Sequence, residues 1–100
     1  MIKWNDGSRN GTGLLDWLDE KNTIAAIDAL EHAAGVKGEW DGGDEDCLPS
    51  WWGLHGTFNG HVFTVYTHKS GCIKIGGFGD GLDVIGLKAA LTDIVNRRAA

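Results

Sequence analysis

Five carboxylates fall within eight residues in the first half of the chain. The stretch Glu39–Gly56 reads EWDGGDEDCLPSWWGLHG, and its acids are Glu39, Asp41, Asp44, Glu45 and Asp46. Carboxylates at this density are typical of a calcium loop, of acid–base catalysis, or of an acidic surface that binds a basic partner. The residues that follow, Cys47, Pro49 and the adjacent pair Trp51-Trp52, add a thiol and two large aromatic side chains.

The calcium pattern fails on spacing. An EF-hand loop needs oxygen ligands at alternate positions and a glutamate at its twelfth position. Counted from Asp41, the twelfth residue is Trp52. A looser oxygen site made by Asp41, Asp44 and Asp46 stays open as an alternative, but we expect a solvated acidic loop.

Histidine and cysteine could provide a metal site or a nucleophile. The chain has four histidines and two cysteines, but it contains no CxxC or HxxxH pair, so the pattern excludes a structural zinc finger. The strand register expected below places His68 opposite Cys72, on the face that also carries His55. A small metal- or thiol-dependent enzyme using these three residues is therefore an alternative function. We expect an ordinary cross-strand pair instead, with no catalytic residue, no metal and no cofactor.

A glycine-rich turn near the C-terminus resembles a phosphate-binding loop only in outline. The segment IKIGGFGDGLDVIG reads as a strand, a glycine loop and a helix, but it lacks both the dinucleotide spacing and a Walker lysine. Asp80 and Asp83 would repel a phosphate at the start of the helix. We predict that one of these two residues caps the helix.

Charge is distributed unevenly along the 100 residues, which we expect to form a single compact domain. Residues 1–50 hold eleven acids and four bases, a net −7, whereas residues 51–100 hold three acids and five bases, a net +2. No Lys or Arg occurs between Gly38 and His68. Nucleic-acid affinity depends largely on neutralised phosphates, so direct nucleic-acid binding is not expected, whereas a basic protein is a favoured partner.

Neither a signal peptide nor a membrane span is evident from the pattern of apolar residues. The first ten residues are polar, and no stretch approaches the roughly 18–20 apolar residues that cross a bilayer. We therefore expect a cytoplasmic protein, in which the simplest state of the two cysteines is the reduced thiol. Whether Cys47 and Cys72 are bridged stays open.

Three helices are expected. Residues 12–22 read as a short helix with Leu14, Leu15, Trp17 and Leu18 on its apolar face. Residues 22–35 form a second helix, with Asn22 or Thr23 as its cap and Gly35 at its left-handed end. A closing helix over residues 81–98 carries an apolar stripe of Val84, Leu87, Leu91 and Ile94 or Val95.

Residues 51–75 are expected to form a meander. Asn59-Gly60 is a strong hairpin signal, and it pairs Phe58 with His61 and Leu54 with Val65. A three-residue second turn places Ile73 and Ile75 on the apolar face and Lys74 on the other face. Residues 1–4 form a strand or an arm, and Val36–Trp40 a strand. The predicted fold is α+β: an antiparallel meander of three or four strands with two N-terminal helices and one C-terminal helix packed on one face.

The sheet face away from the helices is then the candidate binding surface. Trp52 belongs to the core face, whereas Trp51 belongs to the other face, where it is either exposed for binding or covered by the acidic loop or the N-terminal arm. The predicted partner-binding residues are Glu39, Asp41, Asp44, Glu45, Asp46, Trp51, His55, Tyr66 and His68. Burial of the face within a homo-oligomer is a further alternative.

The expected function is non-catalytic protein binding. The acids would steer association with a basic, for example nucleic-acid-binding, surface of a partner, and Trp51 and Tyr66 would supply buried contact. Proteins of this size and charge are common among phage and mobile-element inhibitors such as anti-CRISPR proteins, and a toxin-immunity protein is an alternative of the same kind. We therefore expect an inhibitor or accessory protein that covers its partner's basic surface.

Overall fold

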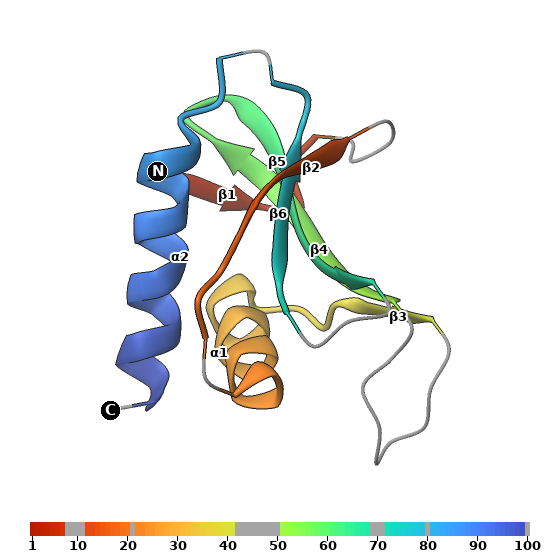
Figure 1. Cartoon of the computed structure of the whole chain (residues 1–100), viewed down its shortest axis with the longest axis vertical. Helices are drawn as coiled ribbons and strands as arrows, with labels where there is room; N and C mark the ends of the chain where they lie inside the picture. The colour runs from red at the N-terminus through yellow and green to blue at the C-terminus, as the bar shows by residue number, and fades with distance from the viewer. Residues whose placement is uncertain (8–11, 21, 42–50, 69–71, 80, 100) are drawn as a thin grey trace.

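The computed structural model describes residues 1–7, 12–20, 22–41, 51–68, 72–79 and 81–99. Along the chain lie β1 (Ile2–Trp4), β2 (Gly13–Trp17), α1 (Thr23–Ala34), β3 (Glu39–Asp41), β4 (Trp51–Phe58), β5 (His61–His68), β6 (Lys74–Gly77) and α2 (Val84–Ala99). All described strand pairs are antiparallel, in the order β1-β4-β5-β6-β2, and β3 pairs with the start of β4, whereas β1 pairs with its end (Figure 1). The α+β class with an antiparallel sheet is thus confirmed, and the sheet is larger than the expected three or four strands.

The helix predicted over residues 12–22 is wrong, so the described chain has two helices and not three. Gly13–Trp17 is strand β2, which pairs with β6. The apolar spacing that suggests a helix comes from a β-bulge between Leu14 and Asp16. A bulge places two residues of one strand opposite a single residue of its partner. The alternation of side chains between the two faces is therefore interrupted. Residues 13–17 form a strand because pairing with β6 satisfies backbone N–H and C=O groups of β6. These groups would stay unpaired if the segment were a short helix.

The central hairpin has the predicted register. Phe58 pairs with His61 and Leu54 with Val65, and Asn59 and Gly60 in the turn both have positive φ. Val65 also pairs with Ile75, as expected for the following strand, but the described ladder between β5 and β6 ends at Tyr66–Lys74. Cys72 therefore precedes β6, and the expected cross-strand pair between His68 and Cys72 is not part of the ladder. The second turn, residues 69–71, lies outside the described residues.

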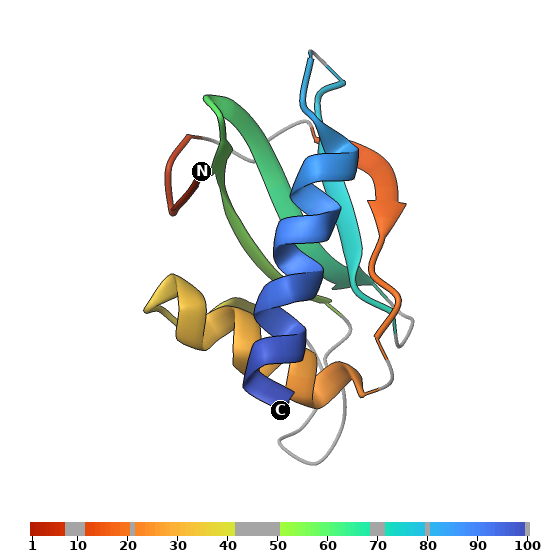
Figure 2. The ribbon, with the colours of Figure 1, turned by 90° about the vertical axis from the view of Figure 1, so that its left-hand side faces the viewer.

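Both helices pack on one face of the sheet, as Figure 2 shows. The predicted caps of both helices are confirmed. Asn22 accepts a hydrogen bond from the Ala25 backbone N–H, Gly35 is left-handed, and Asp83 accepts from the Gly86 N–H at the start of α2. Neither helix has the length and apolar content of a membrane span in the described ranges. The largest fully buried side chains are Trp52, Phe63, Leu30, Ile73, Ile75, Leu87, Leu91, Val65 and Thr67.

A buried carboxylate joins α1 to the sheet. Glu31 is only 8% exposed, and its Oε2 accepts hydrogen bonds from the Gly38 backbone N–H (2.6 Å) and from Trp52 Nε1 (3.4 Å). Lys37 Nζ lies 3.8 Å from Oε1 and partly balances the charge. Gly38 has to be a glycine, because a Cβ there would collide with the Trp52 indole. Glu31 thus sets where the chain leaves α1 and enters β3.

The same carboxylate gives a stability prediction. Glu31→Leu leaves two buried N–H donors without an acceptor, and we expect the free energy of unfolding to fall by about 2–4 kcal/mol. Glu31→Gln keeps an amide oxygen at the same place and should lose about half as much. Urea unfolding followed by tryptophan fluorescence measures both variants. Equal losses in the two variants would show that acceptance of these hydrogen bonds is not what Glu31 contributes.

A pair of glycines tests how β1 docks. A Cβ on Gly56 would collide with the Lys3 carbonyl oxygen and lie 3.1 Å from Trp4 Cα, whereas a Cβ on Gly13 would meet nothing within 4 Å. We expect Gly56→Ala to lower the free energy of unfolding by about 1–3 kcal/mol and to release β1. Gly13→Ala is the control and should change it by less than about 0.5 kcal/mol. Chemical denaturation and amide exchange of Ile2–Trp4 provide the measurements, and equal effects would contradict the docking of β1.

Candidate functional site

The strand register brings Glu39, His55 and Tyr66 to the sheet face opposite the helices, here called the helix-free face. Directly opposed residues of antiparallel strands belong to the same face. Glu39 pairs with Gly53, which pairs with Tyr66 on its other side. In the next row, the backbone positions of Asp41, Trp51 and His68 lie side by side.

The residues that flank the acidic segment are paired in the sheet. Asp41, the last residue of β3, pairs with Trp51, the first residue of β4. Asp44, Glu45 and Asp46, which we predict to be partner contacts, lie outside the described residues, as does Cys47.

The middle of the helix-free face contains an unsatisfied polar group. Thr64 lies between His55 on β4 and Gly76 on β6, and it is 4% exposed. Its hydroxyl has no hydrogen-bond partner in the part of the chain that the structure describes. A Cβ on Gly76 would collide with this hydroxyl and lie 3.2 Å from the Tyr66 ring, so glycine is required there. Partial burial raises the pKa of Tyr66.

Residues after β1 cover the other end of this face. The Asn5 N–H donates to the His55 carbonyl oxygen (2.8 Å), and the Thr57 hydroxyl donates to Asp6 Oδ2 (2.9 Å). Gly7 packs against Val62 with a positive φ of 73°. The surface available to a partner is therefore narrowed toward β5, β6 and β2. Trp4 does not reach this face, because it packs edge-on against Phe63 in the core at 5.5 Å between ring centroids.

Leu14 and Trp17 extend the candidate surface, and the sequence reasoning missed both as binding residues. Leu14 pairs with Gly76 and Trp17 with Lys74, so both side chains lie on the helix-free face, each 52% exposed. Leu15 is on the opposite side, because its side chain reaches toward Leu82 across Gly77. One indirect signal for this arrangement was present in the sequence. The strand predicted after the second turn had an unpaired edge, which a further strand could occupy.

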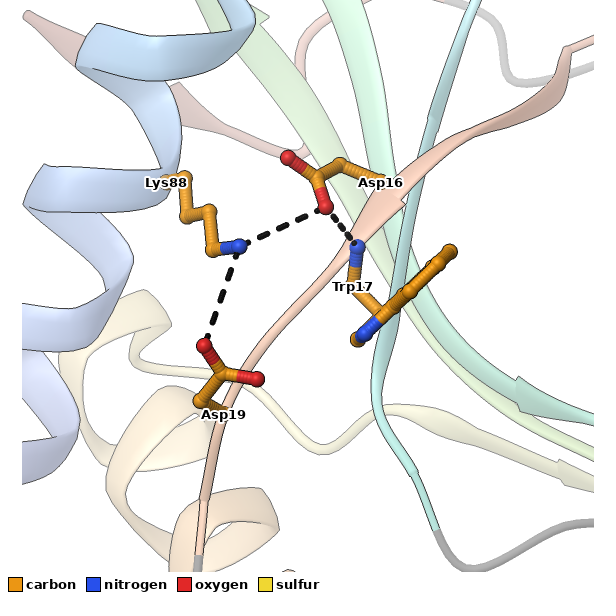
Figure 3. A network of polar contacts seen from close by, with 4 residues as sticks. All are labelled: Asp16, Trp17, Asp19 and Lys88. Atoms are coloured by element: carbon orange, nitrogen blue, oxygen red, sulfur yellow. Dashed lines mark hydrogen bonds and ion pairs between the residues drawn. The ribbon is translucent and has the colours of Figure 1, made fainter.

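A polar network holds β2 to α2 (Figure 3). Asp16 Oδ1 accepts a hydrogen bond from the Trp17 backbone N–H at 2.8 Å and lies 3.4 Å from Lys88 Nζ. Lys88 also lies 4.0 Å from an Asp19 oxygen. The Trp17 N–H is the main cause of a lowered pKa at Asp16, and Lys88 adds to it. Asp16 is therefore ionised at neutral pH, which a lasting contact with Lys88 requires.

Metal or thiol chemistry would need clustered ligands or an activated cysteine. No group of three or more His, Cys, Asp or Glu side chains is close enough to hold a metal ion within the described ranges. Cys72 is an exposed free thiol. It borders a shallow pocket of about 340 Å³, whose described lining has two carboxylates and no histidine: Trp17, Leu18, Asp19, Glu20, Thr23 and Cys72. In this described lining, Asp19 and Glu20 are the groups that could act as a base for the thiol, and no histidine accompanies them.

Comparisons with protein-family models, with curated proteins and with solved structures each found no match. The function is therefore inferred from the residues and geometry of this chain.

The Asp16 network gives a pH-dependent prediction. A carboxyl whose pKa is lower in the folded state than in the unfolded state stabilises the fold at a pH above its unfolded pKa, which is 3.8 for aspartate. That stabilisation is lost as the pH falls through the folded pKa. We expect Asp16→Asn to unfold more easily than the wild type at about pH 7, and the difference to close in acid below the ordinary aspartate pKa.

Lys88→Met separates the two causes of the lowered pKa. It removes the ion pair but leaves the hydrogen bond from the Trp17 N–H, so the pKa of Asp16 should stay below its ordinary value. Carboxyl titration by NMR measures this directly. An ordinary Asp16 pKa in the Lys88→Met variant would show that the ion pair, and not the backbone hydrogen bond, dominates.

Proposed function

We propose that this chain is a non-catalytic protein-binding domain that covers a basic surface of a partner, as an inhibitor or accessory protein. One observation carries the proposal: exposed Leu14 and Trp17 share the helix-free face with Tyr66, His55 and Glu39. Single exposed apolar side chains are ordinary on a protein surface. An apolar pair beside a tyrosine, with an acidic segment anchored at the same sheet, is the combination found in binding surfaces.

The two kinds of residue have different roles in this proposal. Trp17, Leu14 and Tyr66 are the contacts that a partner would bury, and tryptophan and tyrosine are enriched among residues that dominate binding energy. Glu39 and the acids that follow it in the sequence attract a basic partner, because complementary charge raises the association rate. The net charge of −5 favours the same kind of partner and disfavours direct contact with nucleic acid.

A nucleic-acid-binding protein is the kind of partner that offers such a basic surface. We therefore place the chain, as part of the proposal, with small cytoplasmic inhibitors of the phage and mobile-element type, of which anti-CRISPR proteins are an example. A toxin-immunity protein would use the same chemistry, since it too covers a functional surface of a partner. The identity of the captured protein distinguishes the two.

The test is capture of a partner from a lysate of the source cell, with and without nuclease. Trp17→Ala is compared with Ile85→Ala, which removes a similarly apolar side chain that is 85% exposed on α2. We expect affinity for the captured protein to fall by about tenfold or more in Trp17→Ala and to stay unchanged in Ile85→Ala. Titration calorimetry with the purified partner measures both dissociation constants.

The acidic segment is tested with Asp44→Asn, Glu45→Gln and Asp46→Asn combined. We expect this variant to associate more slowly with the partner and to show less dependence on salt, because steering by charge is lost. A partner that is not basic, or one whose capture disappears with nuclease, would contradict the proposal. So would a partner that binds wild type, Trp17→Ala and the acid-neutralised variant equally well.

A further inference from the structure

Strand β2 lies at an outer edge of the sheet. It pairs with β6 along one side, and no described strand pairs with it along the other side. An exposed edge presents N–H and C=O groups to which another strand can add. Such edges are a hazard when the strand is also apolar, because the added strand then buries side chains as well as forming backbone hydrogen bonds.

β2 carries exposed apolar side chains on both of its faces. Leu14 and Trp17 on the helix-free face are each 52% exposed, and Leu15 on the other face is 37% exposed. The one charged residue between Gly13 and Leu18 is Asp16. Without Asp16, this segment would be an uncharged edge strand of the kind that pairs with its own copies.

Asp16 also occupies part of the edge itself. Its Oδ1 accepts the hydrogen bond of the Trp17 backbone N–H at 2.8 Å, so this donor is satisfied within β2. Lys88 from α2 lies 3.4 Å from the same oxygen and helps to hold the carboxylate in place, as Figure 3 shows. The bulge between Leu14 and Asp16 further distorts the strand. Edge charges and bulges are both known means of preventing strand addition.

Charge repulsion is a further obstacle to pairing of two copies through β2. Two copies that paired antiparallel through the middle of β2 would bring their Asp16 residues to directly opposed or diagonal positions, about 5–8 Å apart. Like charges at these separations disfavour the pair, although the Lys88 of each copy, 3.4 Å from its own Asp16, reduces this repulsion. We infer that the free edge of β2 is an association surface for a second copy of this chain, and that Asp16 keeps this surface closed.

The experiment measures self-association of the full chain by analytical ultracentrifugation over a range of concentrations. Asp16→Ala removes both the hydrogen-bond acceptor and the charge, and we expect its dimer dissociation constant to be at least about tenfold lower than that of the wild type. Asp93→Ala is the control, because it removes an equal charge from the exposed i,i+4 pair with Arg97 on α2. It should associate no more strongly than the wild type. Amide exchange of Gly13–Leu15 should slow in the Asp16→Ala dimer.

Two further variants keep the result decisive. Asp16→Asn retains an acceptor for the Trp17 N–H without the charge, so it should associate more weakly than Asp16→Ala but more strongly than the wild type. Leu14→Lys added to Asp16→Ala restores a charge to the edge and should return the chain to a monomer. If Asp16→Ala does not fold, as judged by circular dichroism, folded Asp16→Asn decides the matter.

Any one of three results would overturn the inference. The first is that the folded variants at Asp16 stay monomeric, and the second is that Asp93→Ala associates as strongly as Asp16→Ala. The third is that the wild type already pairs through β2. None of these measurements involves a partner protein. Failure here would therefore leave the proposed binding function untouched, and failure to find a partner would leave this inference untouched.

Discussion

The buried carboxylate of Glu31 is the interaction on which the joint between α1 and the sheet depends. Glu31 accepts hydrogen bonds from the Gly38 backbone N–H, just after the helix, and from the Trp52 indole on β4. A buried charge is tolerated only when hydrogen bonds and a counter-charge compensate it, which here come from these donors and from Lys37. Through this joint, the end of α1 sets the path into β3. That path in turn fixes where the acidic segment begins.

The two outer strands illustrate how a small sheet manages its edges. β1 docks on β4 where Gly56 lets the backbones approach closely, and the following residues, Asn5–Gly7, fold over the helix-free face. β2 docks on β6 and is distorted by a bulge, with a carboxylate satisfying one of its own N–H groups. Both devices limit what can add to the sheet. They also decide how much of the helix-free face is left for a partner.

The candidate site is a product of register. Residues far apart in the sequence, from Leu14 to Tyr66, come to one face because each strand pair preserves the alternation of side chains. The exposed aromatic and apolar side chains lie toward β2, whereas the acidic segment is anchored at β3 and β4. A partner that contacts both would span the width of the sheet. Under the proposed function, this arrangement would suit a broad protein surface better than a small molecule.

The sequence alone determined the local features, because their causes are local. Asn59-Gly60 specifies a tight turn with positive φ, and the alternation on either side then sets the register of the central hairpin. Asn22, Gly35 and Asp83 mark helix ends by hydrogen bonds within a few residues. The core face with Trp52, Leu54 and Val65 follows from the same alternation, as does the shared face of His55 and Tyr66.

Tertiary structure decided the conformation of residues 13–17. Their apolar spacing suits a helix, but β6 required a partner, and the bulge hid the alternation of a strand. Only that pairing exposes Trp17 and Leu14 on the helix-free face and places Asp16 against Lys88. Similarly, no local pattern links Glu31 to Trp52, because their contact depends on how α1 packs on the sheet. Long-range pairing and packing are properties of the whole chain, so a reading of short segments does not reveal them.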